Sequence, residues 1–156
     1  MKMAKIYKLS RSQYIDASPE KIWEFVSSPG NLARITPPSM GFEITSPVED
    51  KMYEGMIITY RVRPLAGIPV TWVTEITHLT EGRYFVDEQR SGPYSLWHHR
   101  HFIEPQGNGT LMTDMVTYIP PLGILGRIAN ALFIRKKLSR IFDFREKAMN
   151  AWAKQN

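Results

Sequence analysis

The sequence contains no cysteine, which excludes a disulfide scaffold, a thiolate metal site and a cysteine nucleophile. It also lacks a run of about 18 apolar residues, the length that a membrane-spanning helix needs. Charged residues interrupt its N-terminal segment every few positions, a pattern that is not typical of a signal peptide. Neither a G-x-S-x-G nucleophile motif nor a nucleotide-binding glycine motif is present. We therefore expect a cytoplasmic domain without a transmembrane segment, and we expect no cofactor.

Acidic residues are fewer than basic ones, 15 against 20, so the chain of 156 residues carries a net charge of +5. This excess is too small to predict a nucleic-acid partner. Part of it is concentrated near the C-terminal end, at Arg135, Lys136, Lys137 and Arg140. Such a cluster can contact an anionic lipid surface, or it can be the solvated face of a helix. Aromatic residues make up 12% of the chain, and so many rings need a core or a cavity to line.

The local patterns run from a strand to short helices, then to strands and to a long helix. Residues 5–15 alternate between apolar and polar side chains, as strands do. The Ser-Pro-Glu segment at 18–20 predicts a helix start, and that helix and a second turn around 31–35 end at prolines. Helical periodicity returns from 122 to about 154. Six strands are expected between these helical parts, at 42–46, 56–63, 70–79, 83–89, 94–104 and 110–119.

Short links between these strands predict an antiparallel meander, because parallel neighbours need crossovers of a dozen residues or more. The C-terminal helix then covers the sheet with its apolar stripe. This stripe comprises Ile134, Leu138, Ile141, Phe144 or Arg145, Ala148 and Trp152. We predict a single α+β domain over residues 1–156, with seven antiparallel strands and two short helices between the first and second strands.

The turn at 106–109 sets the register of the last two strands. If Pro105 lies opposite Thr110 across this four-residue loop, four cross-strand pairs share one face of the sheet. These pairs are Ile103 with Met112, His101 with Asp114, His99 with Val116, and Trp97 with Tyr118. Buried polar groups cost about 1–3 kcal/mol each when they have no partner. The histidines and Asp114 are therefore expected to bond to each other, to water or to a ligand.

Earlier strands offer further residues for the same face. On the strand at 83–89, either Asp87 and Gln89 or the alternate set of Tyr84, Val86 and Glu88 points inward. The preceding turn leaves both arrangements open, and we expect the first. Tyr60 and Trp72 are candidates from the strands before it. The predicted ligand-binding residues are Tyr60, Trp72, Asp87, Gln89, Trp97, His99, His101, Ile103, Met112, Asp114, Val116 and Tyr118.

The two histidines and Asp114 have several possible roles. They can be core imidazoles held by a carboxylate, or they can contact a ligand. Alternatively, His101 and Asp114 can move a proton on a bound substrate, which makes them the candidate catalytic residues. The three side chains offer N and O ligands, but no metal-binding spacing motif surrounds them. We therefore predict no metal.

Three segments, in order along the chain, carry a family resemblance. They are YIDASPEKIWEFVSSPGNLARITPP at 14–38, FVDEQRSGPYSLWHHRHFIEP at 85–105 and GTLMTDMVTYIPPLG at 109–123. Together they resemble the SRPBCC superfamily, which includes START lipid-transfer domains, birch-pollen-allergen-like proteins and polyketide cyclases, and within it a bacterial ligand-binding branch. The resemblance implies a helix-grip fold, in which a curved sheet wraps around the C-terminal helix and encloses a deep cavity. Members bind lipids, hormones, polyketides or aromatic substrates, so the fold does not define the function.

Three functions agree with these features. The first, which we favour, is a non-catalytic binding protein that holds a mainly apolar, aromatic or lipid-like small molecule in the cavity. The second is an enzyme similar to polyketide cyclases and dehydrases, with His101 and Asp114 as its proton-transfer pair. The third is a membrane-surface or protein-partner module that uses residues 122–140. The sequence leaves the ligand and the oligomeric state open.

Overall fold

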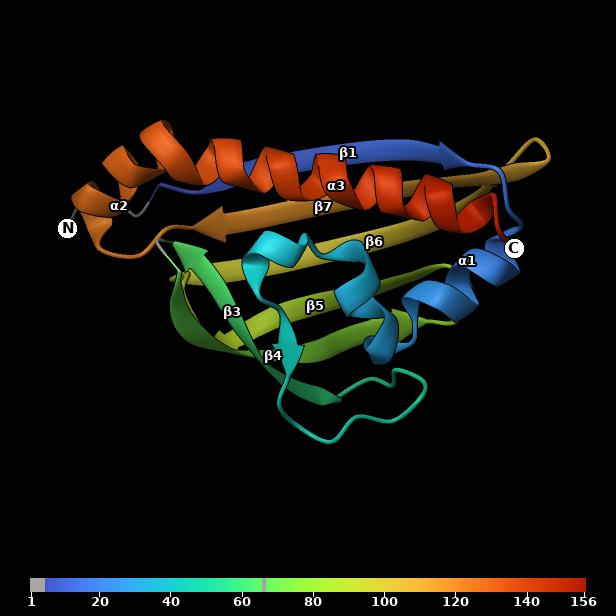
Figure 1. Cartoon of the computed structure of the whole chain (residues 1–156), viewed down its shortest axis with the longest axis horizontal. Helices are drawn as coiled ribbons and strands as arrows, with labels where there is room; N and C mark the ends of the chain where they lie inside the picture. Colours follow the sequence, from blue (N-terminus) through green and yellow to red (C-terminus); the bar gives the residue numbers. More distant parts are fainter. Residues whose placement is uncertain (1–4, 66) are drawn as a thin grey trace.

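The computed structural model describes residues 5–65 and 67–156, and within them it contains one antiparallel sheet. The strand order in this sheet is β1-β7-β6-β5-β4-β3-β2. The predicted seven antiparallel strands and their meander are confirmed, and the structure adds that β1 pairs with β7. Figure 1 shows the sheet curving beneath the helices. The strands are β1 (Tyr7–Ile15), β2 (Glu43–Ile44), β3 (Ile57–Leu65), β4 (Ile68–Thr80), β5 (Tyr84–Ser91), β6 (Leu96–Gln106) and β7 (Gly109–Ile119).

The first of the short helices between β1 and β2 begins where the sequence predicts. The Ser18 side chain accepts a hydrogen bond from the backbone N–H of Lys21 at 3.4 Å, and Pro19 occupies the first turn of α1 (Pro19–Val26). A 3-10 helix, η1 (Pro29–Ile35), follows as expected. A further 3-10 turn, η2 (Pro38–Met40), was not predicted.

The C-terminal helical region has three consecutive parts, α2 (Gly123–Ala129), a π-helical segment η3 (Asn130–Ile134) and α3 (Arg135–Ala153). The predicted long helix is therefore confirmed, with an irregular turn inside it. None of the described helices is both long enough and apolar enough to cross a membrane. In Figure 1, α3 lies across β1, β7 and β6, while α1 and the 3-10 helices lie over the other part of the sheet.

The β6–β7 hairpin has the register that the sequence predicts. Pro105 pairs with Thr110, and the four cross-strand pairs from Ile103–Met112 to Trp97–Tyr118 all occur. The pairing extends one step further, to Gln106 and Gly109, so the turn contains two residues rather than the predicted four. Gly107 permits this tight turn because its φ of 58° lies in the left-handed region, which glycine adopts without steric cost.

Apolar residues between the sheet and the helices form two buried clusters. One contains Ile22 and Phe25 of α1 together with Met149 of α3. The other contains Leu138 and Phe142 of α3. Helix α3 thus contributes to both clusters, and this fixes its position over the sheet.

Candidate functional site

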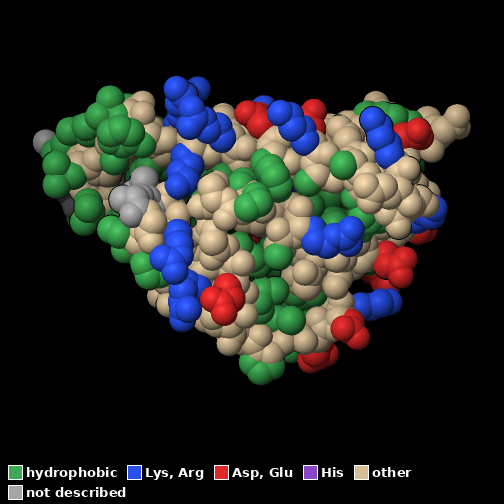
Figure 2. Space-filling view, viewed as in Figure 1, with side chains coloured by type: hydrophobic (Ala, Val, Ile, Leu, Met, Phe, Trp, Pro, Cys, Tyr) green, Lys and Arg blue, Asp and Glu red, His purple; other side chains and the backbone are tan. Residues whose placement is uncertain are grey.

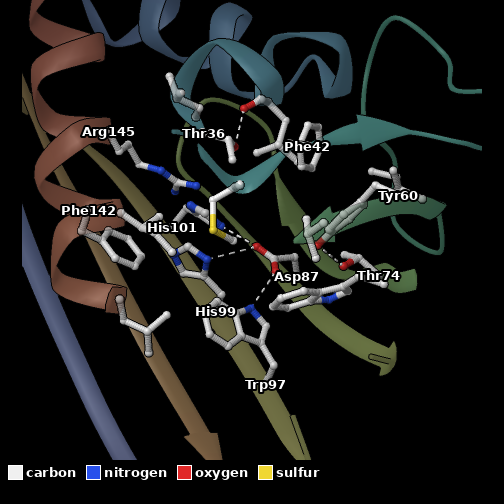
Figure 3. A pocket seen from close by; sticks show the side chains of 18 of the residues that line it. Thr36, Phe42, Tyr60, Thr74, Asp87, Trp97, His99, His101, Phe142 and Arg145 are labelled. Carbon is white, nitrogen blue, oxygen red and sulfur yellow. Dashed lines mark hydrogen bonds and ion pairs between the residues drawn. The ribbon is translucent and has the colours of Figure 1, made fainter. Parts of the chain in front are cut away.

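A cavity of about 200 Å³ lies between the inner face of the sheet, α3 and the short helices. Strands β3 to β7 all contribute to its wall, which is mainly aliphatic and aromatic. Figure 3 shows Phe142 and Arg145 entering from α3, opposite Tyr60 and Thr74 of the sheet. The apolar wall includes Phe25, Phe42, Ile58, Tyr60, Val62, Trp72, Phe85, Tyr94, Trp97, Met112, Leu138 and Phe142.

Seven of the predicted ligand-binding residues line this cavity, and five lie elsewhere. The seven are Tyr60, Trp72, Asp87, Trp97, His99, His101 and Met112. Of the others, Ile103 and Val116 are buried in the two apolar clusters. Gln89 accepts a hydrogen bond from the Tyr94 N–H at 3.1 Å and donates one to the Tyr94 carbonyl at 2.6 Å. It therefore holds the β5–β6 connection instead of facing the cavity.

Tyr118 holds the helical region against the sheet. Its hydroxyl donates to the side-chain carbonyl oxygen of Asn130 at 2.8 Å, and both residues are only 2% exposed. Asn130 is the first residue of the π-helical segment. The buried hydrogen bond thus positions η3 over the end of β7, and the Tyr118 ring is part of the packing beneath it.

Asp87 is the acidic group that faces the cavity. Its Oδ2 atom lies 2.6 Å from Nε2 of His101 and 3.4 Å from Nδ1 of His99, and its Oδ1 atom accepts a hydrogen bond from Nε1 of Trp97 at 3.3 Å. Figure 3 shows these three side chains of β6 converging on Asp87 of the neighbouring strand β5. The β5–β6 register brings them together, since it places Asp87 directly opposite His99.

Asp114 lies behind the histidines and does not line the cavity. Its Oδ1 atom is 2.9 Å from Nε2 of His99 and 2.8 Å from Nδ1 of His101, the latter without hydrogen-bond geometry. Arg145 of α3 approaches the same oxygen to 3.4 Å. Each imidazole is therefore held between two carboxylates, with Asp87 on the cavity side and Asp114 on the other.

The electrostatics of this group keep its carboxylates ionised and separate its two imidazoles. Burial alone raises the pKa of Asp114, but contacts with His101, His99 and Arg145 outweigh it and hold that pKa well below its usual range. For His99, burial and the neighbouring His101 lower the pKa to about 4. For His101, burial lowers the pKa, but the two carboxylates overcome this effect and raise it. At neutral pH we therefore expect a neutral His99 beside a more basic His101.

Two further polar features lie on the cavity wall. The indole N–H of Trp72 is buried and has no hydrogen-bond partner among the described residues. Beside it, the hydroxyl groups of Tyr60 and Thr74 share a hydrogen bond of 2.9 Å. Burial raises the pKa of Tyr60, so its phenol stays protonated. The Trp72 N–H is consequently a donor that is free to meet an acceptor on a bound molecule.

Arg145 is the polar residue of the site that the sequence reasoning left undecided. Helical spacing allowed either Phe144 or Arg145 in the buried stripe, and hydrophobicity favours Phe144. In the structure Arg145 is 8% exposed and contacts Asp114. A second difference concerns Lys137, which lines the cavity and bonds to the Pro64 carbonyl, whereas Arg135, Lys136 and Arg140 are exposed.

These features define a helix-grip domain with an internal, mainly apolar cavity. The family model described as polyketide cyclase/dehydrase and lipid transport matches residues 7–151. The chain belongs to this family, and the predicted membership of the SRPBCC superfamily is confirmed. No curated protein matches the chain by sequence.

Solved structures share the fold at low sequence identity. A START superfamily protein from Mycobacterium smegmatis has a TM-score of 0.69 at 18% identity, covering 95% of this chain and 97% of that one. Major latex-like protein 151 from Panax ginseng has a TM-score of 0.68 at 11% identity, with the same coverage of 95% and 97%. The chain also matches 28% of a nucleoside-diphosphate sugar epimerase from Corynebacterium glutamicum, over 92% of its own length, with a TM-score of 0.65 at 22% identity. These similarities establish the fold and leave the ligand open.

Proposed function

We propose that the protein binds a mainly apolar small molecule that carries an oxygen acceptor, such as a carbonyl group. The observation that carries this proposal is the N–H of Trp72, which has no hydrogen-bond partner in the described part of the chain and lies in the wall of a mainly apolar cavity. A buried donor without a partner costs about 1–3 kcal/mol, and a ligand oxygen would recover much of this cost. Small-molecule sites commonly combine an apolar wall with a few placed polar groups.

The Asp87–His101 pair marks a second polar position in the same cavity. Its atoms are 2.6 Å apart, and both side chains reach the cavity wall. This pair can form hydrogen bonds with a hydroxyl or with a second polar group of the ligand. An enzymatic role similar to that of cyclases or dehydrases stays a prediction. In such an enzyme, the carboxylate that exchanges a proton with His101 at the cavity would be Asp87 rather than the predicted Asp114.

The role of the Trp72 N–H can be tested with a matched pair of fluorescent probes. One is the ketone 6-propionyl-2-dimethylaminonaphthalene, and the other is its 6-propyl analogue, which lacks the carbonyl oxygen. Trp72→Phe keeps an aromatic ring but removes the donor, so we expect it to weaken binding of the ketone about five- to tenfold, the value of one hydrogen bond. Binding of the propyl analogue should be nearly unchanged.

Trp23→Phe is the control for this experiment, because Trp23 packs on Phe85 from α1 and is not part of the cavity wall. Fluorescence titration gives both affinities. Equal losses for the two probes in Trp72→Phe would show that the ring matters and the donor does not. Failure of the wild type to bind either probe would contradict the binding function itself.

A second candidate function is contact with an anionic membrane surface, supported by an exposed apolar segment at 122–133. Six large side chains there are between 52% and 75% exposed: Leu122, Ile124, Leu125, Ile128, Leu132 and Phe133. The exposed basic residues Arg127, Arg135, Lys136 and Arg140 lie on the same helical region. Figure 2 shows hydrophobic side chains gathered at the end of the molecule that α2 occupies in Figure 1, with lysine and arginine side chains beside them. Apolar contact and attraction to anionic lipids together favour such binding.

Vesicle flotation tests this candidate. The wild type should float with vesicles that contain phosphatidylserine and much less with pure phosphatidylcholine vesicles, because basic residues contribute about 1 kcal/mol each near an anionic surface. Replacing Leu125 and Phe133 with serine should reduce flotation several-fold. Ile68→Ser is the matched control, since Ile68 is 62% exposed but lies at the β3–β4 turn. Equal flotation of the double variant and the control would rule out this surface.

A further inference from the structure

We propose that Asp87, His99 and His101 form a binding site for a divalent transition-metal ion of the Zn²⁺ type at the polar end of the cavity. Among the described residues, this is where three histidine or carboxylate side chains bring their ligand atoms within 4.8 Å of one another. All three side chains reach the cavity wall. The inference goes beyond the proposed binding of an apolar molecule, which does not require a metal.

The distances fit an ion after a small adjustment. Zn²⁺ binds imidazole nitrogen and carboxylate oxygen at about 2.0–2.2 Å, so tetrahedral neighbours are about 3.3 Å apart. Oδ2 of Asp87 is already 3.4 Å from Nδ1 of His99. Its distance of 2.6 Å from Nε2 of His101 would have to widen by about 0.7 Å on metal binding. Side-chain rotation of Asp87, whose side chain is 17% exposed at the cavity, can supply this movement.

Asp114 provides the outer support that metal-binding histidines require. Such histidines usually direct their second ring nitrogen at a carboxylate, which fixes the ring and makes the imidazole a stronger ligand. Here Nε2 of His99 forms a hydrogen bond of 2.9 Å with Oδ1 of Asp114, and Nδ1 of His101 lies 2.8 Å from the same atom without hydrogen-bond geometry. Arg145 approaches this oxygen to 3.4 Å. The nitrogens that remain, Nδ1 of His99 and Nε2 of His101, are those that face Asp87.

Geometry and fixed charge also favour a cation. Nε2 of His99 bonds to Asp114, so Nδ1, which lies 3.4 Å from Oδ2 of Asp87, is the ring nitrogen available to a metal ion. The cluster also contains two carboxylates, Asp87 and Asp114, against the single guanidinium of Arg145. Three protein ligands would leave a coordination position open for water or for a ligand oxygen.

The test is calorimetric titration of the chelator-treated protein with ZnSO₄. A variant with His78→Ala and His98→Ala serves as the background, because these two are the only other histidines of the chain and neither lines the cavity. We expect one Zn²⁺ per chain in the wild type and in this background. His99→Ala and the volume-conserving Asp87→Asn should each weaken binding by about a hundredfold or more. Loss of the outer carboxylate in Asp114→Asn should weaken it by about 10–100-fold.

Two additional measurements make the result specific. Co²⁺ in place of Zn²⁺ should give visible absorption bands that His99→Ala abolishes, and near-ultraviolet circular dichroism checks that each variant is folded. The proposal is overturned if the folded His99→Ala and Asp87→Asn variants bind Zn²⁺ as tightly as the wild type, or if binding disappears in the His78→Ala/His98→Ala background. Titration of the metal-free protein with the naphthalene ketone separates this inference from the proposed function, because that binding should persist without metal.

Discussion

Replacing Asp114 with leucine is expected to lower the free energy of unfolding by about 3–5 kcal/mol, the usual effect of removing one partner from a buried ion pair. Asp114 is 5% exposed, and its Oδ1 atom lies within 3.4 Å of both histidines and of Arg145. Without Asp114, the buried guanidinium of Arg145 loses its anionic partner, and Nε2 of His99 loses its acceptor. Urea unfolding at neutral pH measures the change.

The matched control is Asp143→Leu on the same helix as Arg145. Asp143 also pairs with an arginine, since it lies 3.2 Å from Arg11, but 52% of its side chain is exposed. Surface pairs of this kind contribute less than about 1 kcal/mol. Adding Arg145→Met to Asp114→Leu should restore part of the lost stability, because an apolar pair removes the unpaired charge. Equal losses in the two single variants would contradict the importance assigned to the buried network.

Replacing Val62 with tryptophan is expected to weaken binding of the naphthalene ketone at least tenfold, which corresponds to about 1.4 kcal/mol. Val62 is 3% exposed and its side chain lies in the cavity wall. The larger ring has to occupy the space of about 200 Å³ that the ligand would use. Overpacking of this kind costs about 1–3 kcal/mol of stability, so fluorescence titration should be done at a temperature at which unfolding is absent.

Val48→Trp makes the same substitution outside the cavity. Val48 is 37% exposed in the connection between β2 and β3, and it is not part of the cavity wall. This variant should bind the ketone with the affinity of the wild type. If Val62→Trp also binds normally while it remains folded, the probe occupies another part of the protein, and the cavity loses its assigned role.

Local sequence patterns were sufficient for most of the elements, though not for η2 or η3, and for one hairpin. The cap at Ser18, the proline that follows it and the turn after Gln106 are short-range signals, and each acts within a few residues. A tight turn also fixes which residues of two strands lie opposite each other. The β6–β7 hairpin was therefore predictable, including the face shared by His99, His101 and Asp114.

The assignment of partners within the site was not predictable from these patterns. Asp87 reaches the two histidines through the β5–β6 register, and the connection between these strands is held by the Gln89 side chain rather than by a regular tight turn. The β4–β5 pairing contains two register shifts. Because each shift changes which residues lie opposite each other, simple alternation along the two strands does not predict their pairing. The expectation that Asp87 faces inward agrees with the structure, whereas Gln89 faces its own loop.

The sequence by itself determined the order of elements, the family and the hairpin face that carries the histidines, because capping, turn chemistry and side-chain alternation act between near neighbours. Only the tertiary structure decided that Asp87 lies on the cavity side of the imidazoles, that Asp114 lies behind them in contact with Arg145, and that the Trp72 N–H has no partner among the described residues. These relations join β4, β5, β6, β7 and α3, and they depend on strand register and on how α3 is placed over the sheet. That placement results from the packing of the whole apolar core, which no local pattern encodes.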